Sequence, residues 1–589
     1  MKLLNNYKAL YKGELRAKLA RYLLKKTRLI EKLYKLPENE SFEYINYFGD
    51  VNKKYEQLQD YDIDFQNYEL MGKKIDLLNY SFIDNSNEKK WFYLALPKNK
   101  DIKIIWEINR LQFLPQMAIS FLKTKDHELL KKIEKIIKEW NTKNPYDIGI
   151  NWYSNLEVAI RSISLLLTYI LLYDYIKSKE IEELLYKHGF HVYKDIGYTQ
   201  NCIPNNHLIG EATSLYLLGN IINTKRSKRW ISKSKKILLE YSNFLRDDGT
   251  FKEASLSYHR FVLQMYMLVY LFSNKFKDKF IQNIFENKLK SAVEFFKSIE
   301  KTDRTYPQFG DWDDGVYYKF DPYKVTDFHQ FVDTLSYFFT KNNPTIDNKI
   351  LESIFGKIDI HNNLNPKNYH VFEQGKYGIY KNDRIYLFIN NQEQLFHSHS
   401  DGLSVELCIN GKDILTDSGT YNYNLDKSLR SYFRSTRAHN TVFLGLDQST
   451  QIGSFRWIDQ PKTTLRKLDE IVGFEGIIQY KDKSFHKRKV IIESKEIIIE
   501  DEVHSNKHYI EINFHFSSKR QIEFTKNGMV RIDNEITMNI TSPNNFETKI
   551  EDSFYSPSYN KIEKRKNLKV ISKNENQNFT TTITFKELF

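Results

Sequence analysis

The spacing of apolar residues changes once along this chain, and that change constrains the fold more than any single motif. Up to about residue 345, apolar residues recur at steps of three and four, as in 261–268, which is typical of helices with one buried face. After about residue 365, apolar and charged residues alternate, as in 486–503, which is typical of half-buried strands. The interval between them is rich in Asn, Asp and Pro. The sequence therefore predicts a helical domain at 1–345, a linker at 346–367 and a β domain at 368–589.

Short polar or Pro-containing breaks divide the helical part, for example at 142–147, 202–206 and 304–315. Helices joined in this way favour an α/α-toroid, which is an incomplete α/α barrel, or a related helical array. A solenoid of identical repeats is disfavoured because the sequence has no fixed period. In the second part, short strands bounded by Asn, Asp, Gly and Lys turns predict an antiparallel β-sandwich. The predicted fold is multidomain α+β, and 589 residues are enough for more than one core.

Composition narrows the class of partner. A net charge of +13 is typical of chains that bind nucleic acid, anionic lipid or an acidic polymer. The sequence contains no zinc finger, no RNA-binding aromatic signature and no Walker loop, so we predict no nucleic-acid partner. Aromatic residues make up 15% of the chain, and exposed aromatic rings stack on sugars. These features favour an acidic polysaccharide or oligosaccharide as the ligand, and no motif predicts an oligomeric state.

The N-terminal segment bears on the compartment. Residues 1–26 are positively charged throughout and lack the uninterrupted apolar core of a secretory signal, so they predict a basic amphipathic helix. The apolar run at 163–176 is interrupted by polar residues and is too short to span a bilayer, so we expect a buried helix and no transmembrane segment. The two cysteines predict no disulfide framework. We expect a cytoplasmic protein if Met1 is the native start, and a periplasmic or secreted one if the chain is a mature form.

Metal-type residues gather in the β part. His397, His399 and Asp401 are spaced two apart in strand-like sequence, so their side chains can share one face. Asp417 and His439 follow. A His/His/Asp set is a ligand set that zinc accepts. The alternative interpretation is a pair of strand histidines with ordinary hydrogen-bond partners, and Asp401 fits either a residue behind the ligands or a turn.

Acid–base residues gather in the helical part. Asn206 and His207 open a helical segment, and Tyr258 lies farther along in SYHR. Taken alone, an Asn-His pair is ordinarily a helix cap followed by a surface histidine, and a single Tyr is ordinarily a core aromatic. Glu211 lies four residues after His207, on the same helical face, where it either orients the imidazole or forms a surface pair. Together with the β-part residues, they predict an active site in a groove between the two domains.

Several segments together resemble the heparinase II/III-like polysaccharide lyases. In the β part these are FHSHSDGLSVEL (396–407), GKDILTDSGTYNY (411–423) and YFRSTRAHNTV (432–442). In the helical part they include NNHLIGEATSLY (205–216) and EASLSYHRFVLQMY (253–266). The resemblance implies an α/α-toroid joined to a β-sandwich, with lyase activity on acidic polysaccharides. It also implies that His399, Asp417 and His439 bind a zinc ion, or another divalent ion, that stabilises the groove wall, which leaves His397 for the cleft.

Cleavage of a uronic-acid glycan by β-elimination requires a group that neutralises the carboxylate, a base for the α proton and an acid for the leaving oxygen. The resemblance gives Asn206 the neutralising role. His207 is a natural base because its pKa is ordinarily near neutral. Tyr258 can act as the acid, or as the base if a cation such as Arg260 lowers its pKa. We also count His397 among the catalytic candidates.

Further positions are candidates for binding the glycan. The substrate-binding candidates are Arg110, Trp152, Glu211, Arg260, Tyr432 and Arg434. A second catalytic tyrosine could be Tyr421, Tyr423 or Tyr432. We expect a structural role for Asp311, Asp313 and Asp314, because carboxylates repel an anionic substrate.

The first functional hypothesis is a polysaccharide lyase that acts on a uronic-acid-containing glycan. A second is a non-catalytic protein on the same scaffold that binds acidic glycans or serves exopolysaccharide or capsule assembly. A third is a glycoside hydrolase, which requires two carboxylates across the cleft. For that pair the sequence offers Glu211 with Asp311 or Asp313.

Overall fold

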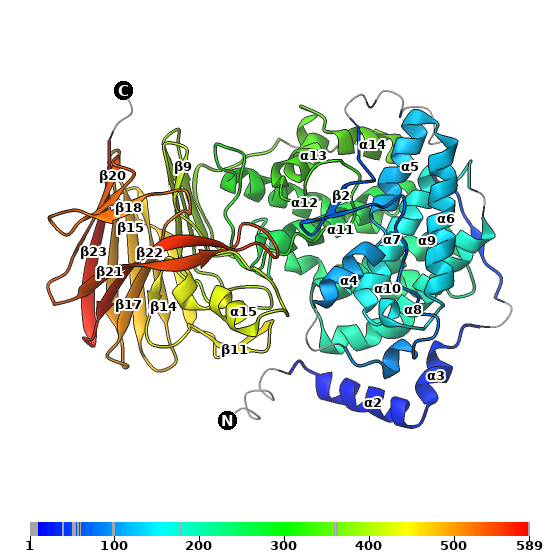
Figure 1. Ribbon diagram of the computed structural model, residues 1–589, viewed down its shortest axis with the longest axis horizontal. Helices are drawn as coiled ribbons and strands as arrows, with labels where there is room; N and C mark the ends of the chain where they lie inside the picture. The colour runs from blue at the N-terminus through cyan, green and yellow to red at the C-terminus, as the bar shows by residue number, and fades with distance from the viewer. Residues whose placement is uncertain are drawn as a thin grey trace.

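The structure is a computed structural model that describes residues 10–37, 40–49, 55, 58, 61–96, 101–176, 178–357, 360 and 363–586. A helical body and a β body lie end to end along the long axis, with mainly helices from the blue to the green part of the chain and mainly strands from yellow to red (Figure 1). The predicted fold class, helical in the first part and antiparallel β in the second, is confirmed. Within the described residues, none of the helices combines the length and the apolar character needed to cross a membrane.

The helical body consists of an inner and an outer layer. Its principal helices are α4 (Ile102–Asn109), α5 (Phe113–Thr124), α6 (His127–Lys143), α7 (Asn155–Leu171), α8 (Lys179–Cys202), α9 (Asn206–Ile221), α10 (Ser227–Tyr241), α11 (Leu256–Lys275), α12 (Lys279–Ile299), α13 (Phe328–Thr340) and α14 (Ile346–Phe355). Nearly every residue of α7, α9 and α11 is buried, whereas α6, α10 and α12 bury one face only. A helix that is apolar all round belongs in the interior, so α7, α9 and α11 form the inner layer. Two N-terminal helices, α2 (Glu14–Lys26) and α3 (Leu29–Tyr34), pack against α8 at the outer edge of this body (Figure 1).

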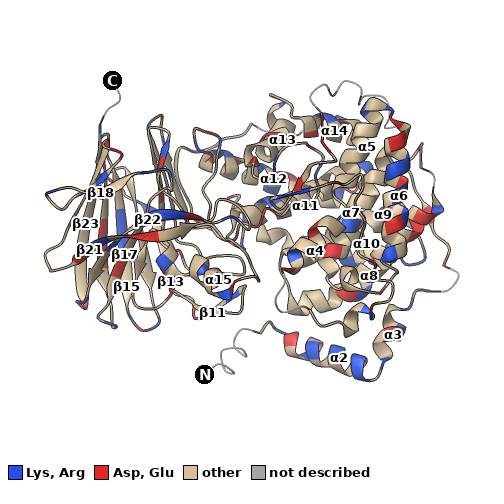
Figure 2. Ribbon diagram, in the orientation of Figure 1, with Lys and Arg blue, Asp and Glu red and all other residues tan. Residues whose placement is uncertain are grey.

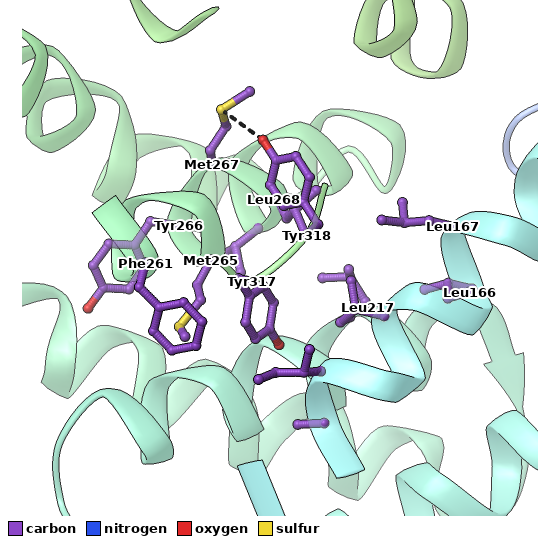
Figure 3. Packing of buried hydrophobic residues seen from close by; sticks show 14 of the residues in the cluster. Leu166, Leu167, Leu217, Phe261, Met265, Tyr266, Met267, Leu268, Tyr317 and Tyr318 are labelled. Carbon is purple, nitrogen blue, oxygen red and sulfur yellow. Dashed lines mark hydrogen bonds between the residues drawn. The ribbon is translucent and has the colours of Figure 1, made fainter. Parts of the chain in front are cut away.

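The inner layer is closed by aromatic residues from the loop before α13. Tyr317 donates a hydrogen bond from its hydroxyl to the Gly210 carbonyl of α9, over 2.7 Å. Tyr318 contacts the Met267 sulfur of α11, at 3.6 Å. Figure 3 shows both rings among Leu217, Met265 and Leu268. The buried stretch at 306–320 is therefore part of the core, which fixes Asp311, Asp313 and Asp314.

The helical body continues into the interval predicted as a linker. Helix α14 occupies Ile346–Phe355, and the first strand of the β body starts only at Tyr369. A capping box formed by Thr345 and Asn348 starts α14. The usual capping box has Glu or Gln at this second position, so the Asn and Pro around it gave a linker-like composition to a helix start.

The β body is a stack of antiparallel sheets. One sheet has the order β5-β6-β7-β8-β9, a larger one β13-β14-β15-β16-β23-β20-β19-β18, and a third β10-β17-β22-β21. The strands of these sheets are β5 (Tyr369–Phe372), β6 (Tyr377–Lys381), β7 (Ile385–Asn390), β8 (Val405–Ile409), β9 (Lys412–Leu415), β10 (Val442–Phe443), β13 (Lys462–Lys467), β14 (Gly473–Gln479), β15 (Phe485–Ile492), β16 (Glu496–His504), β17 (Ile510–His515), β18 (Ile522–Phe524), β19 (Val530–Ile532), β20 (Ile536–Thr541), β21 (Glu547–Tyr555), β22 (Glu563–Ser572) and β23 (Asn576–Phe585). Apolar residues from all three sheets share one core.

The two bodies share buried contacts through the five-stranded sheet. Every residue of β7 and β8 is buried. One face of the sheet contributes to the β core, and the other, through Tyr377, Tyr386 and Phe388, joins the core of the helical body. The Phe309 and Phe388 rings stack with centroids 5.3 Å apart. The connection from β7 to β8, which carries His397 and His399, therefore lies between the two bodies.

Candidate active site and metal centre

A cleft of about 350 Å³ lies where the two bodies meet. Helical residues Asn206, His207 and Tyr258 line it, and His397 from the β7–β8 connection faces them. The structure thus brings together the four residues predicted to be catalytic. The remaining residues that line the cleft are Tyr11, Ile102, Lys103, Trp106, Arg110, Ser154, Leu156, Glu157, Cys202, Ile203, Asn205, Phe261, Asp313, Gly315, Phe396, Tyr423, Asn424, Phe455 and Arg456.

Asn206 is fixed at the first position of α9. The preceding Asn205 caps the helix by accepting a hydrogen bond from the His207 backbone N–H, at 3.1 Å. The backbone N–H and the Nδ2 of Asn206 both donate to the Glu253 carboxylate, at 2.6 and 2.7 Å. Among the described residues, the buried Oδ1 of Asn206 has no hydrogen-bond partner. Because buried polar atoms are ordinarily paired, this oxygen is available to a ligand.

Tyr258 and His397 form the centre of the cleft. Their rings stack with centroids 3.5 Å apart and planes 10° from parallel. The Tyr258 hydroxyl donates to Asp313 Oδ2 over 3.1 Å and lies 3.2 Å from the Tyr423 hydroxyl. Burial, and then the negative charges of Asp313 and Asp311, raise the pKa of Tyr258 well above its usual value. The phenol is therefore protonated at neutral pH.

The pKa of His207 is shifted in the opposite direction from that of Tyr258. Burial, followed by the nearby His397, lowers the pKa of the His207 imidazole to about 4. Glu157 and Arg110 act on it with opposite signs. The His207 imidazole is therefore neutral at pH 7 and able to accept a proton. The cleft thus holds a proton acceptor and a proton donor whose pKa values are shifted in opposite directions.

Asp311 connects the cleft to the residues predicted to bind metal. Its carboxylate contacts His397 Nδ1 at 2.9 Å and His399 Nε2 at 3.1 Å, and pairs with Arg430. Burial opposes the charge of Asp311, but Arg430 and the two imidazoles outweigh it and hold its pKa well below the usual value. Gly310, next to Asp311, allows the chain to pass close to Ala254. Its φ is +66°, and a Cβ at this position would lie 2.3 Å from the Ala254 carbonyl oxygen.

His399, Asp417 and His439 form a buried trio whose ligand atoms all lie within 4.8 Å of one another. Nδ1 of His399 is 3.2 Å from Nε2 of His439, which is 3.4 Å from Asp417 Oδ2. Two ligands about 2.0–2.1 Å from a zinc ion at the tetrahedral angle are themselves about 3.3 Å apart. Both spacings around His439 therefore match a pair of ligands on a tetrahedral zinc ion, and the third ligand pair lies within 4.8 Å.

The hydrogen bonds on the far side of each imidazole support this interpretation. His439 Nδ1 is 2.8 Å from the Ser435 carbonyl oxygen, which only accepts, so this nitrogen carries the proton. His399 Nε2 faces the ionised Asp311, so it too carries the proton. Lone pairs on the other two nitrogens then face each other, an arrangement that a bound cation stabilises. Asp401 accepts instead from Asn390 Nδ2, at 3.1 Å, and shapes a turn through its carbonyl.

Of the predicted substrate-binding residues, only Arg110 lines the cleft. Its guanidinium donates to both oxygens of Glu157, at 2.7 and 2.8 Å, and contacts Glu107 at 2.8 Å. Much of its charge is therefore balanced within the protein. Asp313 is balanced in the same way, because Lys103, the Gly315 backbone N–H and Arg110 outweigh its burial and lower its pKa.

Trp152 and Glu211 do not reach the cleft, which corrects their predicted roles. Trp152 is 0% exposed and packs against Trp140 and His188, so no sugar can stack on it. Glu211 accepts from Asn155 at 2.6 Å and from Thr199 at 2.9 Å, within the helical core. It therefore neither orients His207 nor pairs with Asp313 across the cleft.

Arg260, Tyr432 and Arg434 are also outside the cleft. Arg260 donates to the Val325 and Gly315 carbonyls, so it braces the loop before α13. Tyr432 and Arg434 belong to α15 (Lys427–Arg434), where the buried Arg434 stacks on Trp457 with 4.3 Å between guanidinium carbon and ring centroid. These three residues support the walls of the site but do not line the cleft.

Some residues of the site were not predicted from the sequence. Glu253 holds Asn206 and lies 3.9 Å from His397 Nε2. Arg430 pairs with Asp311, and Arg456 brings a cation to the cleft from strand β12 (Arg456–Ile458). Glu253 is the first residue of the segment 253–266 and Arg430 lies just before the segment 432–442, but the partners of both residues are far away in sequence. Of the three candidates for a second tyrosine, only Tyr423 lines the cleft.

Comparison with known proteins matches the chain in both of its parts. The family described as Heparinase II/III N-terminus matches residues 5–328, and the one described as Heparinase II/III-like, C-terminal, matches residues 365–586. A heparin-sulfate lyase from Pedobacter heparinus is 22% identical over 385 residues, which span 62% of this chain and 55% of that protein. The chain thus matches about half the length of this curated relative.

Solved structures share the fold. A crystal structure of heparinase III aligns with a TM-score of 0.63 at 17% identity, covering 98% of this chain and 93% of that one. A chondroitin AC lyase from Streptomyces coelicolor, solved with chondroitin sulphate, aligns with a TM-score of 0.50 at 11% identity, covering 84% and 76%. At these identities the likeness concerns the arrangement of the helical and β bodies.

Proposed function

Because this chain belongs to the heparinase II/III-like family, we propose that it is a polysaccharide lyase that cleaves a uronic-acid-containing glycan by β-elimination. The observation that carries the proposal is the cleft shared by the two bodies, in which Asn206, His207 and Tyr258 face His397. The relatives named heparin-sulfate lyase and chondroitin AC lyase favour glycosaminoglycans as the first substrates to test.

Each step of the elimination has a candidate residue. We place Asn206 and His397 at the substrate carboxyl group, which takes up a proton from solvent on binding and donates it in a hydrogen bond to the unpartnered Oδ1 of Asn206. Neutral His207 takes the proton from C5. The C4–O4 bond breaks, a C4–C5 double bond forms, and the protonated Tyr258 hydroxyl supplies the proton for the leaving oxygen.

The neighbours of Tyr258 support its role as the acid. Asp313 accepts a hydrogen bond from the phenol and keeps the proton on it. Tyr423 lies at 3.2 Å from the same hydroxyl and is itself kept protonated by burial and by Asp313, so after turnover it can relay a proton from solvent to the Tyr258 phenolate. We assign Tyr423 as the second tyrosine of the site.

The proposal includes a zinc ion held by His399, Asp417 and His439. The two imidazoles and the carboxylate fit this ion by spacing and by tautomer. When bound, the ion contributes a positive charge that cross-links the connections at 391–404, 416–426 and 435–441 behind the cleft. Its function is to stabilise this wall, because Asn206, His207 and Tyr258 provide for the elimination without a Lewis acid.

A panel of acidic glycans tests the proposal. A lyase produces unsaturated uronate, which is followed by its ultraviolet absorbance. Reducing ends without this chromophore would indicate a hydrolase, and binding in affinity electrophoresis without either product would indicate a non-catalytic glycan-binding or assembly protein. Tyr258→Phe provides the matched inactive control.

A further inference from the structure

Helix α2 exposes its apolar face to solvent and turns polar residues toward the protein. Leu15, Leu19, Tyr22 and Leu23 are 60, 55, 59 and 50% exposed, and their spacing puts them on one helical face. We call these four residues the α2 stripe. A surface helix ordinarily turns such a stripe toward the protein core. In α2 the stripe faces solvent, so the attachment of the helix to the protein does not explain it.

Polar residues on the opposite face hold α2 to the protein. The buried Glu14 accepts from Arg456 of the β body, at 2.9 Å. Arg21 pairs with Asp195 of α8 and places its guanidinium carbon 3.2 Å from the centroid of the Tyr198 ring. These contacts fix the orientation of α2, and the α2 stripe therefore points away from the protein.

Basic residues flank the α2 stripe. Arg16, Lys18 and Lys26 are exposed on the same helix. Figure 2 shows the blue bands of Lys and Arg along α2, at the outer edge of the molecule. Residues 12–35 contain nine Lys and Arg against two Glu, an excess that makes up about half of the net charge of +13. The next helix, α3, adds exposed Leu29 and Leu33, at 48 and 38%.

We propose that α2 lies on an anionic membrane surface, with the α2 stripe inserted among the lipids and its flanking Lys and Arg at the headgroups. A short helix with an apolar face and basic flanks is suited to lie in the plane of the bilayer interface. Its 13 residues are too few to cross one. A protein partner is less favoured because protein interfaces are depleted in Lys, which is the commonest charged residue here.

Docking through α2 brings the cleft close to the membrane. Tyr11, just before α2, lines the cleft, and Glu14 holds Arg456, which also lines it. The helix on the membrane is thus directly attached to the cleft wall. This placement suits a glycan that is held near a membrane, and it does not depend on which reaction the cleft performs.

Co-sedimentation with lipid vesicles tests the proposal on the full chain. The protein should sediment with vesicles of phosphatidylglycerol and phosphatidylcholine and far less with phosphatidylcholine alone, and added salt should weaken the binding. The double variant L19S/L23S should lower the partition by about tenfold or more, because two inserted leucines are lost. The pair Arg16→Ser with Lys26→Ser should reduce both the binding and its salt dependence.

A control pair distinguishes the α2 stripe from exposed apolar residues in general. Ile83 and Leu446 are 65 and 60% exposed elsewhere on the surface, so I83S/L446S should bind vesicles like the unaltered protein. All variants should keep the same unfolding temperature and the same activity on soluble glycan. Equal sedimentation of L19S/L23S and the unaltered protein would overturn the proposal. A second outcome would also overturn it: the unaltered protein does not bind vesicles and is a dimer, and L19S/L23S is a monomer. The α2 stripe would then be an interface between copies of the chain.

Discussion

The ring of Tyr258 and the imidazole of His397 stack with their centroids 3.5 Å apart, although one comes from helix α11 and the other from the β7–β8 connection. Neither body of the protein contains the whole site, so the alignment of the reacting groups depends on the packing between the two bodies. The stack also limits the directions in which the Tyr258 hydroxyl can point. Asp313 and Tyr423, its hydrogen-bond partners, then select one of them.

Tyr258→Phe should remove the proton donor and retain the stack. The ring is buried among residues that a Phe ring would also contact, so the unfolding temperature should change little. We expect kcat to fall roughly 10²–10⁴-fold, which is the usual contribution of a positioned general acid. Initial rates of unsaturated uronate formation measure the change.

Tyr432→Phe is the matched control, because this tyrosine belongs to the β body and lies outside the cleft. Its activity should equal that of the unaltered protein. Full activity of Tyr258→Phe would exclude the phenol from the reaction, and a loss in Tyr432→Phe equal to that of Tyr258→Phe would point to general damage of the fold.

Glu253→Gln should weaken the positioning of Asn206. The carboxylate accepts from the backbone N–H and the Nδ2 of Asn206, and a Gln side chain offers one acceptor oxygen where the carboxylate offers two. A misplaced amide should lower kcat by about ten- to a hundredfold, with a smaller change in KM. Glu253→Asp, which keeps the charge but shortens the side chain, should recover part of the loss. An effect on KM alone would instead place Glu253 in substrate binding.

The pH dependence of kcat/KM should identify the base. Burial lowers the pKa of His207 to about 4, so the imidazole is neutral above this pH and loses its lone pair to a proton below it. If His207 takes the C5 proton, kcat/KM should stay constant on going down through pH 6.5 and should fall to half near pH 4. The profile is measured on a protein that remains folded over this range, as checked by circular dichroism.

His207→Gln supplies the comparison for that profile. Its residual activity should be low and should lack the acid limb. An acid limb near pH 6.5 in the unaltered protein would indicate a base with an ordinary histidine pKa. If the same limb persisted in His207→Gln, the base would be another group of the cleft.

The sequence predicted the division into two bodies because periodicity of three to four and of two residues is a local property. The grouping of His399, Asp417 and His439 was also accessible, since their motifs could be compared with a family. The face of a helix that neighbouring helices cover is not a local property of the sequence. Glu211 shares a face with His207 by spacing, yet Asn155 and Thr199 of neighbouring helices hold it in the core.

Residues that act through distant partners were harder to predict. Glu253 contacts Asn206 from 47 positions away, and Asp311 contacts His397 from 86 positions away. The sequence favours a structural role for Asp311, because an acid repels an anionic substrate. The structure shows how it is compensated, since Arg430, 119 positions farther along, pairs with it inside the wall. Trp152 illustrates the opposite case, in which an aromatic residue suited to a sugar lies wholly within the core.

Removal of the metal should destabilise the β body without abolishing the reaction. His439→Ala deletes one of three candidate ligands and leaves Asp417 facing His399 in a buried space. Bound zinc, measured by elemental analysis, should fall from about one ion per chain to near zero. The unfolding temperature should drop by about 5 °C or more, because a ligand that binds only the folded state stabilises it. Turnover at a temperature well below unfolding should persist within about tenfold of the unaltered protein, since Asn206, His207 and Tyr258 remain in place.

His486→Ala is the matched control, because His486 is equally buried but pairs with Asp501 at 2.7 Å and is not one of the three candidate ligands. It should lose stability and keep its zinc. A His439→Ala protein that retained zinc would exclude this trio as the site, and one that stayed folded but lost all turnover would give the ion a direct part in the elimination.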